Sequence, residues 1–83
     1  MRWDPAKSER LKHARGVSFE ELVQAELVCI LAHASRDNQK LMLFRYQEYI
    51  WVAPCAVSGE DVFLKTLFPS RKYTKMFERG ALP

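Results

Sequence analysis

The sequence predicts an α+β domain with two N-terminal helices, a four-stranded antiparallel sheet and a C-terminal helix. Helix-capping residues occur near both ends of the chain, and aromatic and aliphatic runs separated by short polar turns fill the middle. Strands that follow one another through short turns pair antiparallel, and we expect the helices to cover one face of their sheet. The 83 residues suffice for one core, so we expect a single domain over residues 1–83.

Capping residues predict the first two helices. Asp4 is a suitable N-cap, and the proline after it takes the first helical position, where a missing N–H costs nothing. This helix should run to about Arg15, with Gly16 in the left-handed conformation just past its end. Ser18 and Glu21 then form a capping box that begins a second, short helix.

Four strands and a last helix are expected after these. The strands are predicted over 27–32, 40–47, 49–57 and 62–68, with polar turns at 36–39 and 58–61. A tight turn near Gln47-Glu48 separates the middle two strands. Because Pro54 lacks a ladder N–H, its strand should lie at an edge of the sheet or be bulged there. Ser70 and Gly80 are the expected cap and stop of the last helix.

Composition excludes several classes of protein. With 48% hydrophobic residues and a formal charge of +3, the chain is an ordinary globular protein. No uncharged run is long enough to cross a membrane, and no apolar N-terminal stretch resembles a signal peptide, so we expect a cytoplasmic protein. Cys29 and Cys55 lack partners at metal-ligand spacing, which favours small buried hydrophobic residues over a disulfide. Neither a metal nor a cofactor is expected, since the motifs for Gly-rich phosphate loops and paired-carboxylate metal sites are missing.

The last helix carries the most informative charges. Arg71, Lys75 and Arg79 recur every four residues and form a basic stripe. Arg71 and Lys72 also occupy the first turn, where the helix dipole disfavours cations by about 0.3–1 kcal/mol each. Cations beside the free N–H groups of a helix start suit a phosphate-binding site. A solvated surface is the alternative, and both interpretations stay open here.

Other candidates have ordinary structural explanations. Arg45 lies among four aromatic residues that could stack on bases, although a small domain needs its large side chains inside. These aromatic residues are Phe44, Tyr46, Tyr49 and Trp51. On the first helix, Lys12 and Arg15 share a face, and Glu9 is placed to pair with Lys12. His13 and His33 have no carboxylate or cysteine at catalytic or ligand spacing, which favours structural roles for both.

Two stretches resemble the BrnT-type toxins, the ribonuclease components of bacterial type II toxin–antitoxin pairs. Trp3-Asp4-Pro5-Ala6-Lys7, followed by Arg15-Gly16-Val17-Ser18-Phe19-Glu20-Glu21, is similar to the N-terminal signature of the family. Pro69-Ser70-Arg71-Lys72-Tyr73-Thr74 is similar to its C-terminal S-A-R-K-A-T element. The match spans nearly the whole chain. Two departures stand out: the lysine and histidine of the family's K-H-G fall on Ala14 and Arg15, and Tyr73 replaces a small residue.

The resemblance implies a RelE-like fold and RNA cleavage without metal, in which a ribose 2′-hydroxyl attacks the adjacent phosphate. It implies that Arg71 and Lys72 stabilise the charge that develops on that phosphate. Arg15, in the place of the family histidine, would hold a phosphate but cannot act as a base, and Lys65 would assist.

The remaining expectations concern partners. Lys75, Arg79 and Arg45 are the expected RNA contacts outside the reacting phosphate. The resemblance also implies inhibition by a cognate antitoxin, with a heterotetramer as one form of the complex. No residue stands out as the general base. The alternative is therefore a non-catalytic nucleic-acid- or protein-binding module on the same fold.

Overall fold

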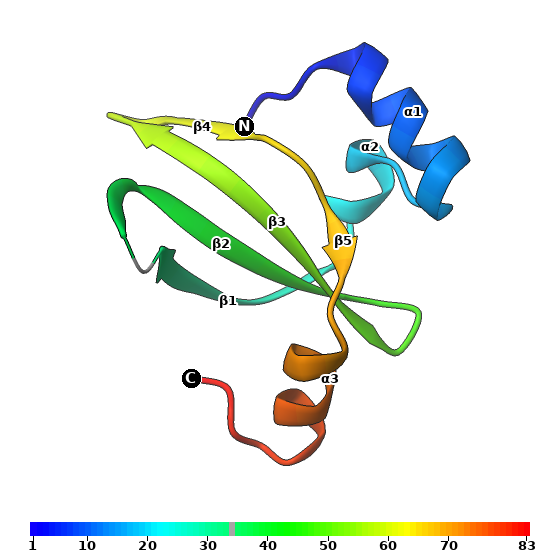
Figure 1. The fold of residues 1–83 in the computed structure, drawn as a ribbon, viewed down its shortest axis with the longest axis vertical. Helices are drawn as coiled ribbons and strands as arrows, with labels where there is room; N and C mark the ends of the chain where they lie inside the picture. Colours follow the sequence, from blue (N-terminus) through cyan, green and yellow to red (C-terminus); the bar gives the residue numbers. More distant parts are fainter. Residues whose placement is uncertain (34) are drawn as a thin grey trace.

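An antiparallel sheet with helices on both sides makes up the structure, a computed structural model that describes residues 1–33 and 35–83 (Figure 1). The elements in chain order are α1 (Pro5–Arg15), α2 (Phe19–Leu22), β1 (Glu26–His33), β2 (Arg36–Tyr46), β3 (Tyr49–Ser58), β4 (Asp61–Leu64), β5 (Phe68–Pro69) and α3 (Arg71–Glu78). The predicted α+β class is confirmed, and the elements follow the predicted order except that the last predicted strand is divided into β4 and β5.

The sheet has the order β1-β2-β3-β4, and β5 pairs with β3 separately from β4. The expected tight turn joins β2 to β3, where Gln47 and Glu48 both have positive φ angles of 51° and 64°. Two successive left-handed residues are typical of a type I′ turn, whose twist matches that of the paired strands. At the far edge, the N-terminal segment covers β4, since the N–H of Arg2 donates to the carbonyl of Val62 at 2.8 Å.

The helices cover both faces of the sheet, so the expectation of one covered face is wrong (Figure 1). Trp51 and Ala53 of β3 enter one hydrophobic cluster with α1 and α2, while Ile50 and Val52 enter another with α3. The helices contribute Leu11, Phe19 and Leu22 to the first cluster and Tyr73 and Phe77 to the second. Successive side chains of a strand point to opposite faces, and a nearly continuous apolar run therefore requires cover on both sides.

Two strand boundaries differ from the predicted ones. The polar residues 36–39 belong to β2 instead of forming a turn, and Gln39 pairs with Ala56 of β3. Arg36 and Asn38 are exposed and Gln39 is partly buried, and such polar residues fit a strand because its ladder uses backbone groups. The predicted strand over 62–68 is interrupted, with β4 ending at Leu64 and β5 beginning at Phe68.

Pro54 lies in the interior strand β3, which corrects the prediction of an edge strand or bulge. Its carbonyl accepts a hydrogen bond of 2.9 Å from the N–H of Lys65, just past the end of β4. The N and O atoms of one residue point to the same side of an antiparallel strand. The missing N–H of Pro54 therefore faces the interruption between β4 and β5, where little of the ladder is lost.

Ser8 links the two N-terminal helices. Its side chain is buried, its hydroxyl donates to a carboxylate oxygen of Glu20, and it accepts the N–H of Phe19 at 2.9 Å. The indole N–H of Trp3 donates to the other oxygen of Glu20 at 3.1 Å. These bonds satisfy the polar groups at the start of α2, and the bond from Ser8 is the main cause of the lowered pKa of Glu20.

The predicted capping box is confirmed and extended. Ser18 accepts the N–H of Glu21, and the Glu21 carboxylate accepts the N–H of Ser18 at 3.0 Å. Lys12 pairs with Glu21 at 2.9 Å, whereas we had predicted Glu9 as its partner. The bond from Lys12, followed by the bond from Ser18, lowers the pKa of Glu21. Lys12 pairs with Glu21 because the acidic first turn of α2 lies beside the last turn of α1.

Both cysteines are free, and the predicted buried position is confirmed for Cys55, while Cys29 is partly buried. Cys55 is buried in the cluster with α1 and α2, and Cys29 packs against the cluster with α3, on the opposite face. Burial raises the pKa of both thiols. Within residues 1–33 and 35–83, no helix is both long and apolar enough to cross a membrane.

Replacing Ser8 with alanine should destabilise the fold. The buried N–H of Phe19 would lose its acceptor, which costs about 1–3 kcal/mol. At roughly 4–8 °C per kcal/mol for a domain of this size, the loss is visible as a lower melting temperature. The exposed Ser58 at the end of β3 provides the control, since Ser58→Ala should melt like the wild type. Equal melting of the two variants would contradict the role of Ser8.

Glu20 and Glu21 should make stability depend on acid pH. Their folded-state pKa values lie below the ordinary 4.5, so the unfolded chain binds more protons in acid. Their contribution to the free energy of unfolding is complete at a pH above the ordinary pKa of 4.5, and it is lost as the pH falls through the pKa values of the folded state. Between about pH 5 and pH 3, the urea midpoint should fall more steeply for the wild type than for the Glu20→Gln, Glu21→Gln variant. Parallel profiles would show that these bonds do not persist in solution.

Candidate nucleic-acid interface

Two hydrogen bonds hold helix α3 against the start of β3, and a third lies within the first turn of the helix. The N–H of Ser70 donates to the carbonyl of Ile50 at 2.9 Å. The N–H of Ile50 donates to the hydroxyl of the buried Thr74 at 2.9 Å, and that hydroxyl donates to the carbonyl of Ser70 at 2.7 Å. Ser70 also caps the helix by accepting the N–H of Tyr73 at 3.1 Å, which confirms the predicted cap. The first turn of α3 is thus fixed relative to the sheet.

That first turn presents cations to solvent. Arg71 and Lys72 are both exposed, and the turn contains no acidic residue. The first turn of α2, in contrast, contains Glu20 and Glu21, which the helix dipole favours. The same chain therefore follows the electrostatic preference of a helix start in α2 and opposes it in α3.

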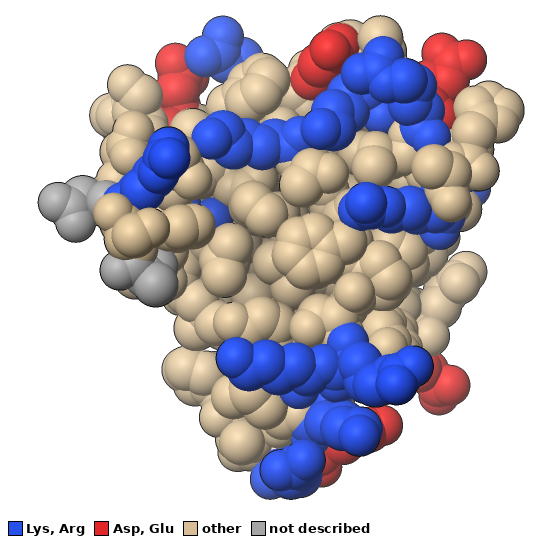
Figure 2. Space-filling model, in the orientation of Figure 1, with Lys and Arg blue, Asp and Glu red and all other residues tan. Residues whose placement is uncertain are grey.

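The basic residues of α3 form one of two positive groups on a single face of the molecule. Figure 2 shows Lys and Arg side chains over α3 and, separately, toward α1 and β4, with a band of uncharged side chains between them. Lys75 and Arg79 lie further along α3 and are exposed like the first-turn pair. Acidic Glu78 is the one counter-charge within α3.

Arg45 of β2 lies beside α3. Its guanidinium is 5.6 Å from the ring centre of Phe77 and 3.8 Å from a carboxylate oxygen of Glu26. The aromatic residues around it belong to the core: Phe44 and Trp51 are buried, and Tyr46 and Tyr49 pack against the same cluster. The core interpretation of these four is confirmed, and Arg45 is the exposed member of the group.

Arg15 and Lys65 lie along the connection that leads from β4 to α3. The Arg15 guanidinium donates to the carbonyl of Leu67, which holds α1 to this connection. The Gln39 side-chain oxygen, in the amide orientation that satisfies its neighbours, accepts from Lys65 Nζ at 3.1 Å and Arg36 Nη1 at 3.3 Å. The predicted residues thus form three sets, with Arg15 at Leu67, Lys65 at Gln39 and the remaining cations on or beside α3.

Two exposed aromatic residues on this connection were not among the predicted site residues. Phe63 of β4 and Phe68 of β5 are 40% and 37% exposed. Phe68 lies between Leu67, which Arg15 contacts, and Ser70, the cap of α3. The adjacent pair Leu67-Phe68 was an available signal, because neighbouring residues of an extended chain face opposite ways. Leu67 is fully buried, and Phe68 therefore points outward.

The two histidines are distant from α3 in the sequence. His33, at the end of β1, accepts the N–H of Ser35 through Nδ1 at 3.3 Å. His13 is exposed on α1. Among the residues that the structure describes, no group of three or more His, Cys, Asp or Glu side chains could hold a metal ion.

An open pocket of about 350 Å³ beside α2 has the wrong charge for a phosphate. It is lined by Glu20, Glu21, Gln24, Ala25 and Tyr46. Its two carboxylates already accept hydrogen bonds from Ser8, Trp3 and Lys12. The cations of α3, not this pocket, make the candidate interface.

Comparison with known proteins gives no relative from which a function can be transferred. No family model matches the chain, and no curated protein or solved structure is significantly similar to it.

Replacing Thr74 with valine should loosen α3. The buried N–H of Ile50 would lose its acceptor while the volume of the side chain is kept, at a cost of about 1–3 kcal/mol. Thr74→Ser keeps the hydroxyl and should retain most of the stability. Urea unfolding of the two variants measures the difference. If Thr74→Val is as stable as Thr74→Ser, the hydroxyl does not fix α3 to β3.

Proposed function

We propose that this chain is the toxin of a type II toxin–antitoxin pair, a metal-independent endoribonuclease that a cognate antitoxin holds inactive. The observation that carries the proposal is the pair of exposed cations, Arg71 and Lys72, on the first turn of a helix fixed to the sheet. These residues belong to the stretch that resembles the C-terminal element of the BrnT-type toxins. Such a toxin acts in the bacterial cytoplasm, where RNA and the antitoxin are its partners.

The proposed reaction breaks the RNA chain at phosphorus. The ribose 2′-oxygen attacks the adjacent phosphorus, its proton is removed, and the bond to the 5′-oxygen breaks. The 5′-oxygen takes up a proton, so the products end in a 2′,3′-cyclic phosphate and a 5′-hydroxyl. Negative charge increases on the phosphate oxygens during the attack, and the cations of Arg71 and Lys72 would stabilise it.

The other basic residues would hold the RNA on either side of the reacting phosphate. Lys75, Arg79 and Arg45 are exposed on or beside α3, where they suit contacts to neighbouring phosphates. Arg15 uses part of its guanidinium on Leu67 and retains further N–H donors for a phosphate. Lys65 lies on the same connection between β4 and α3, and its side chain contacts Gln39.

A non-catalytic nucleic-acid-binding module is the second candidate. The contact from Arg15 to Leu67 favours it, because a structural arginine occupies the position of the family histidine. Arginine does not exchange a proton at neutral pH, so this position supplies no general base. Binding without cleavage would support the module.

Product analysis distinguishes the two candidates. Purified protein should be incubated with RNA in EDTA, and the ends of the products should be identified. Cleavage to 2′,3′-cyclic phosphate ends would support the ribonuclease, and growth arrest on expression that the neighbouring gene relieves would support the toxin. Intact RNA together with normal growth of cells holding folded protein would contradict the proposal.

The Arg71→Ala, Lys72→Ala variant should separate function from stability. Removing two cations from a helix start should leave the melting temperature equal to or above that of the wild type. The cleavage rate should fall on the order of 10²–10³-fold, which corresponds to about 2–4 kcal/mol of transition-state stabilisation.

The Lys75→Ala, Arg79→Ala variant is the matched control, since it removes the same charge from the same helix. Its effect should be smaller and should fade as salt is raised, as expected for diffuse phosphate contacts. Unfolding of the first-turn variant would make Arg71 and Lys72 structural residues. Full activity of the Arg71→Ala, Lys72→Ala variant would show that other residues stabilise the reacting phosphate, and Arg15 would be tested next.

A further inference from the structure

Phe63 and Phe68 lie on the same face of the sheet as α3. Phe63 pairs with Ala56, and Phe68 pairs with Val52, which packs in the cluster with α3. Residues 52 and 56 of β3 are four apart and therefore share a face. At about 3.3 Å per residue, the two rings are separated along the sheet by roughly 13 Å. Both rings are large apolar surfaces left open to solvent.

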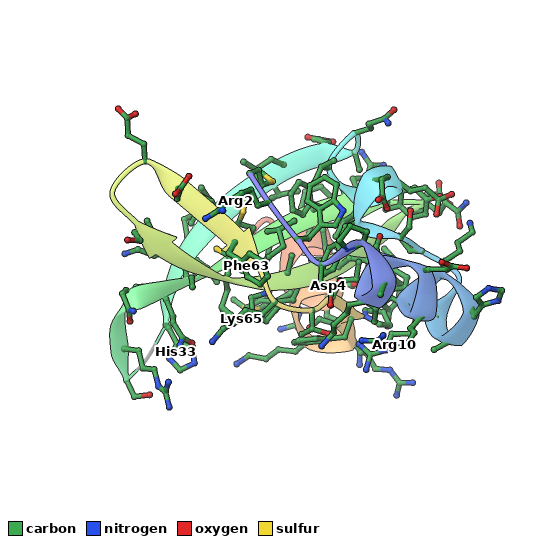
Figure 3. The ribbon with its side chains drawn as sticks, turned by 90° about the horizontal axis from the view of Figure 1, so that it is seen from above. Arg2, Asp4, Arg10, His33, Phe63 and Lys65 are labelled. Atoms are coloured by element: carbon green, nitrogen blue, oxygen red, sulfur yellow. The ribbon has the colours of Figure 1, made fainter. Side chains whose placement is uncertain are left out.

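The backbone of a basic residue, Lys65, lies between those of the two phenylalanines, and its side chain reaches Gln39 of β2. The N–H of Lys65 donates to Pro54, so the extended chain continues one residue past β4, and the Lys65 side chain faces the same way as Phe63. The Gln39 side-chain oxygen, in the amide orientation given above, accepts hydrogen bonds from Lys65 Nζ at 3.1 Å and Arg36 Nη1 at 3.3 Å. Arg36 is therefore a second cation beside Lys65. Lys65 and His33 extend toward the same side of the molecule (Figure 3).

Two further cations flank Phe68, one by its contact and one by its place in the chain. Arg15 contacts the residue before this ring, and Arg71 begins the helix three residues after it. Rings and cations therefore alternate along the path from β4 through β5 to α3. The two partly exposed phenylalanines therefore share one face of the sheet, with the basic residues Lys65 and Arg71 between and after them along the chain.

We propose that Phe63 and Phe68 are stacking sites for unpaired bases of an RNA strand that runs from α3 along β5 to Lys65 and Arg36. The proposal rests on the RNA binding proposed above and identifies the residues that extend it beyond the reacting phosphate. Proteins that bind single strands combine a positively charged track with aromatic rings, and each stacked base contributes about 1–3 kcal/mol. Only unpaired bases offer their faces, so this surface would prefer a single strand to a duplex.

The test measures binding of a labelled, unstructured 2′-O-methyl RNA and of a hairpin duplex of equal length by fluorescence anisotropy. The 2′-O-methyl group removes the attacking hydroxyl, so binding is measured without cleavage. Phe63→Leu and Phe68→Leu keep apolar volume and remove the ring. Ile30→Ala is the control, because Ile30 is 55% exposed and pairs with Met42 of the cluster on the opposite face.

Each phenylalanine variant should bind the single strand at least about fivefold more weakly, the lower end of a stacking contribution. The slope of log affinity against log salt should not change for these variants, because they remove no charge. Lys65→Ala should reduce that slope by about 0.7, the value for one phosphate contact on a single strand. Ile30→Ala should bind like the wild type, and the wild type should prefer the single strand to the hairpin.

The outcomes separate this inference from the proposed function. If both phenylalanine variants bind like the wild type while Arg71→Ala, Lys72→Ala binds weakly, the stacking sites are refuted and the RNA-binding function stands. Equal affinity of the wild type for hairpin and single strand would also refute the stacking sites. If the folded wild type binds neither RNA at low salt, both the stacking sites and the proposed function fail.

Discussion

Strand β3 is the element on which the other parts of the structure depend. It pairs with β2, β4 and β5, and its alternating side chains enter the hydrophobic clusters on both faces of the sheet. Ile50, near its start, also exchanges hydrogen bonds with Ser70 and Thr74 of the α3 region. A shift of this strand by one residue would exchange the two faces and remove both clusters together. Its register therefore also fixes the position of the candidate interface.

The first turns of helices α2 and α3 carry charges of opposite sign. At the start of α2, Glu20 and Glu21 satisfy the dipole and accept hydrogen bonds from Ser8 and Lys12. At the start of α3, Arg71 and Lys72 oppose the dipole and face solvent. Local stability explains the first arrangement, whereas in the second the Lys72 Nζ, 5.4 Å from the centre of the Tyr73 ring, has a local contact that offsets part of the dipole's cost. A phosphate bound at α3 would offset the repulsion between these cations and the helix dipole, because it interacts favourably with both the cations and the helix start.

Arg15 connects the scaffold to the candidate interface. It ends α1, and its guanidinium reaches the carbonyl of Leu67 on the connection between β4 and β5. This contact brings a cation of the N-terminal helix to the chain segment that continues into α3. Two stretches far apart in the sequence, around residues 15 and 67, thereby come into contact.

Several elements of this chain have local causes and could be predicted from its residues alone. Asp4, Ser18 and Ser70 each cap a helix as predicted, Gly16 adopts the left-handed conformation past α1, and a two-residue turn joins β2 to β3. Each of these follows from hydrogen bonds or dihedral preferences within a few residues. The basic stripe of α3 was visible for the same reason, since helical spacing alone gathers Arg71, Lys75 and Arg79.

Features that depend on partners far away in the chain could not be predicted in this way. The placement of α3 on the face opposite α1, the interior position of Pro54 and the pairing of Lys12 with Glu21 all depend on which segments pack together. The break between β4 and β5 exposes Phe68 while Leu67 stays buried, and the predicted continuous strand 62–68 did not distinguish the two. Local patterns specify how a segment folds, but they do not specify which neighbour covers each of its faces. In this chain the common face of Phe63 and Phe68 and the contact from Arg15 to Leu67 therefore emerged only once the sheet was assembled.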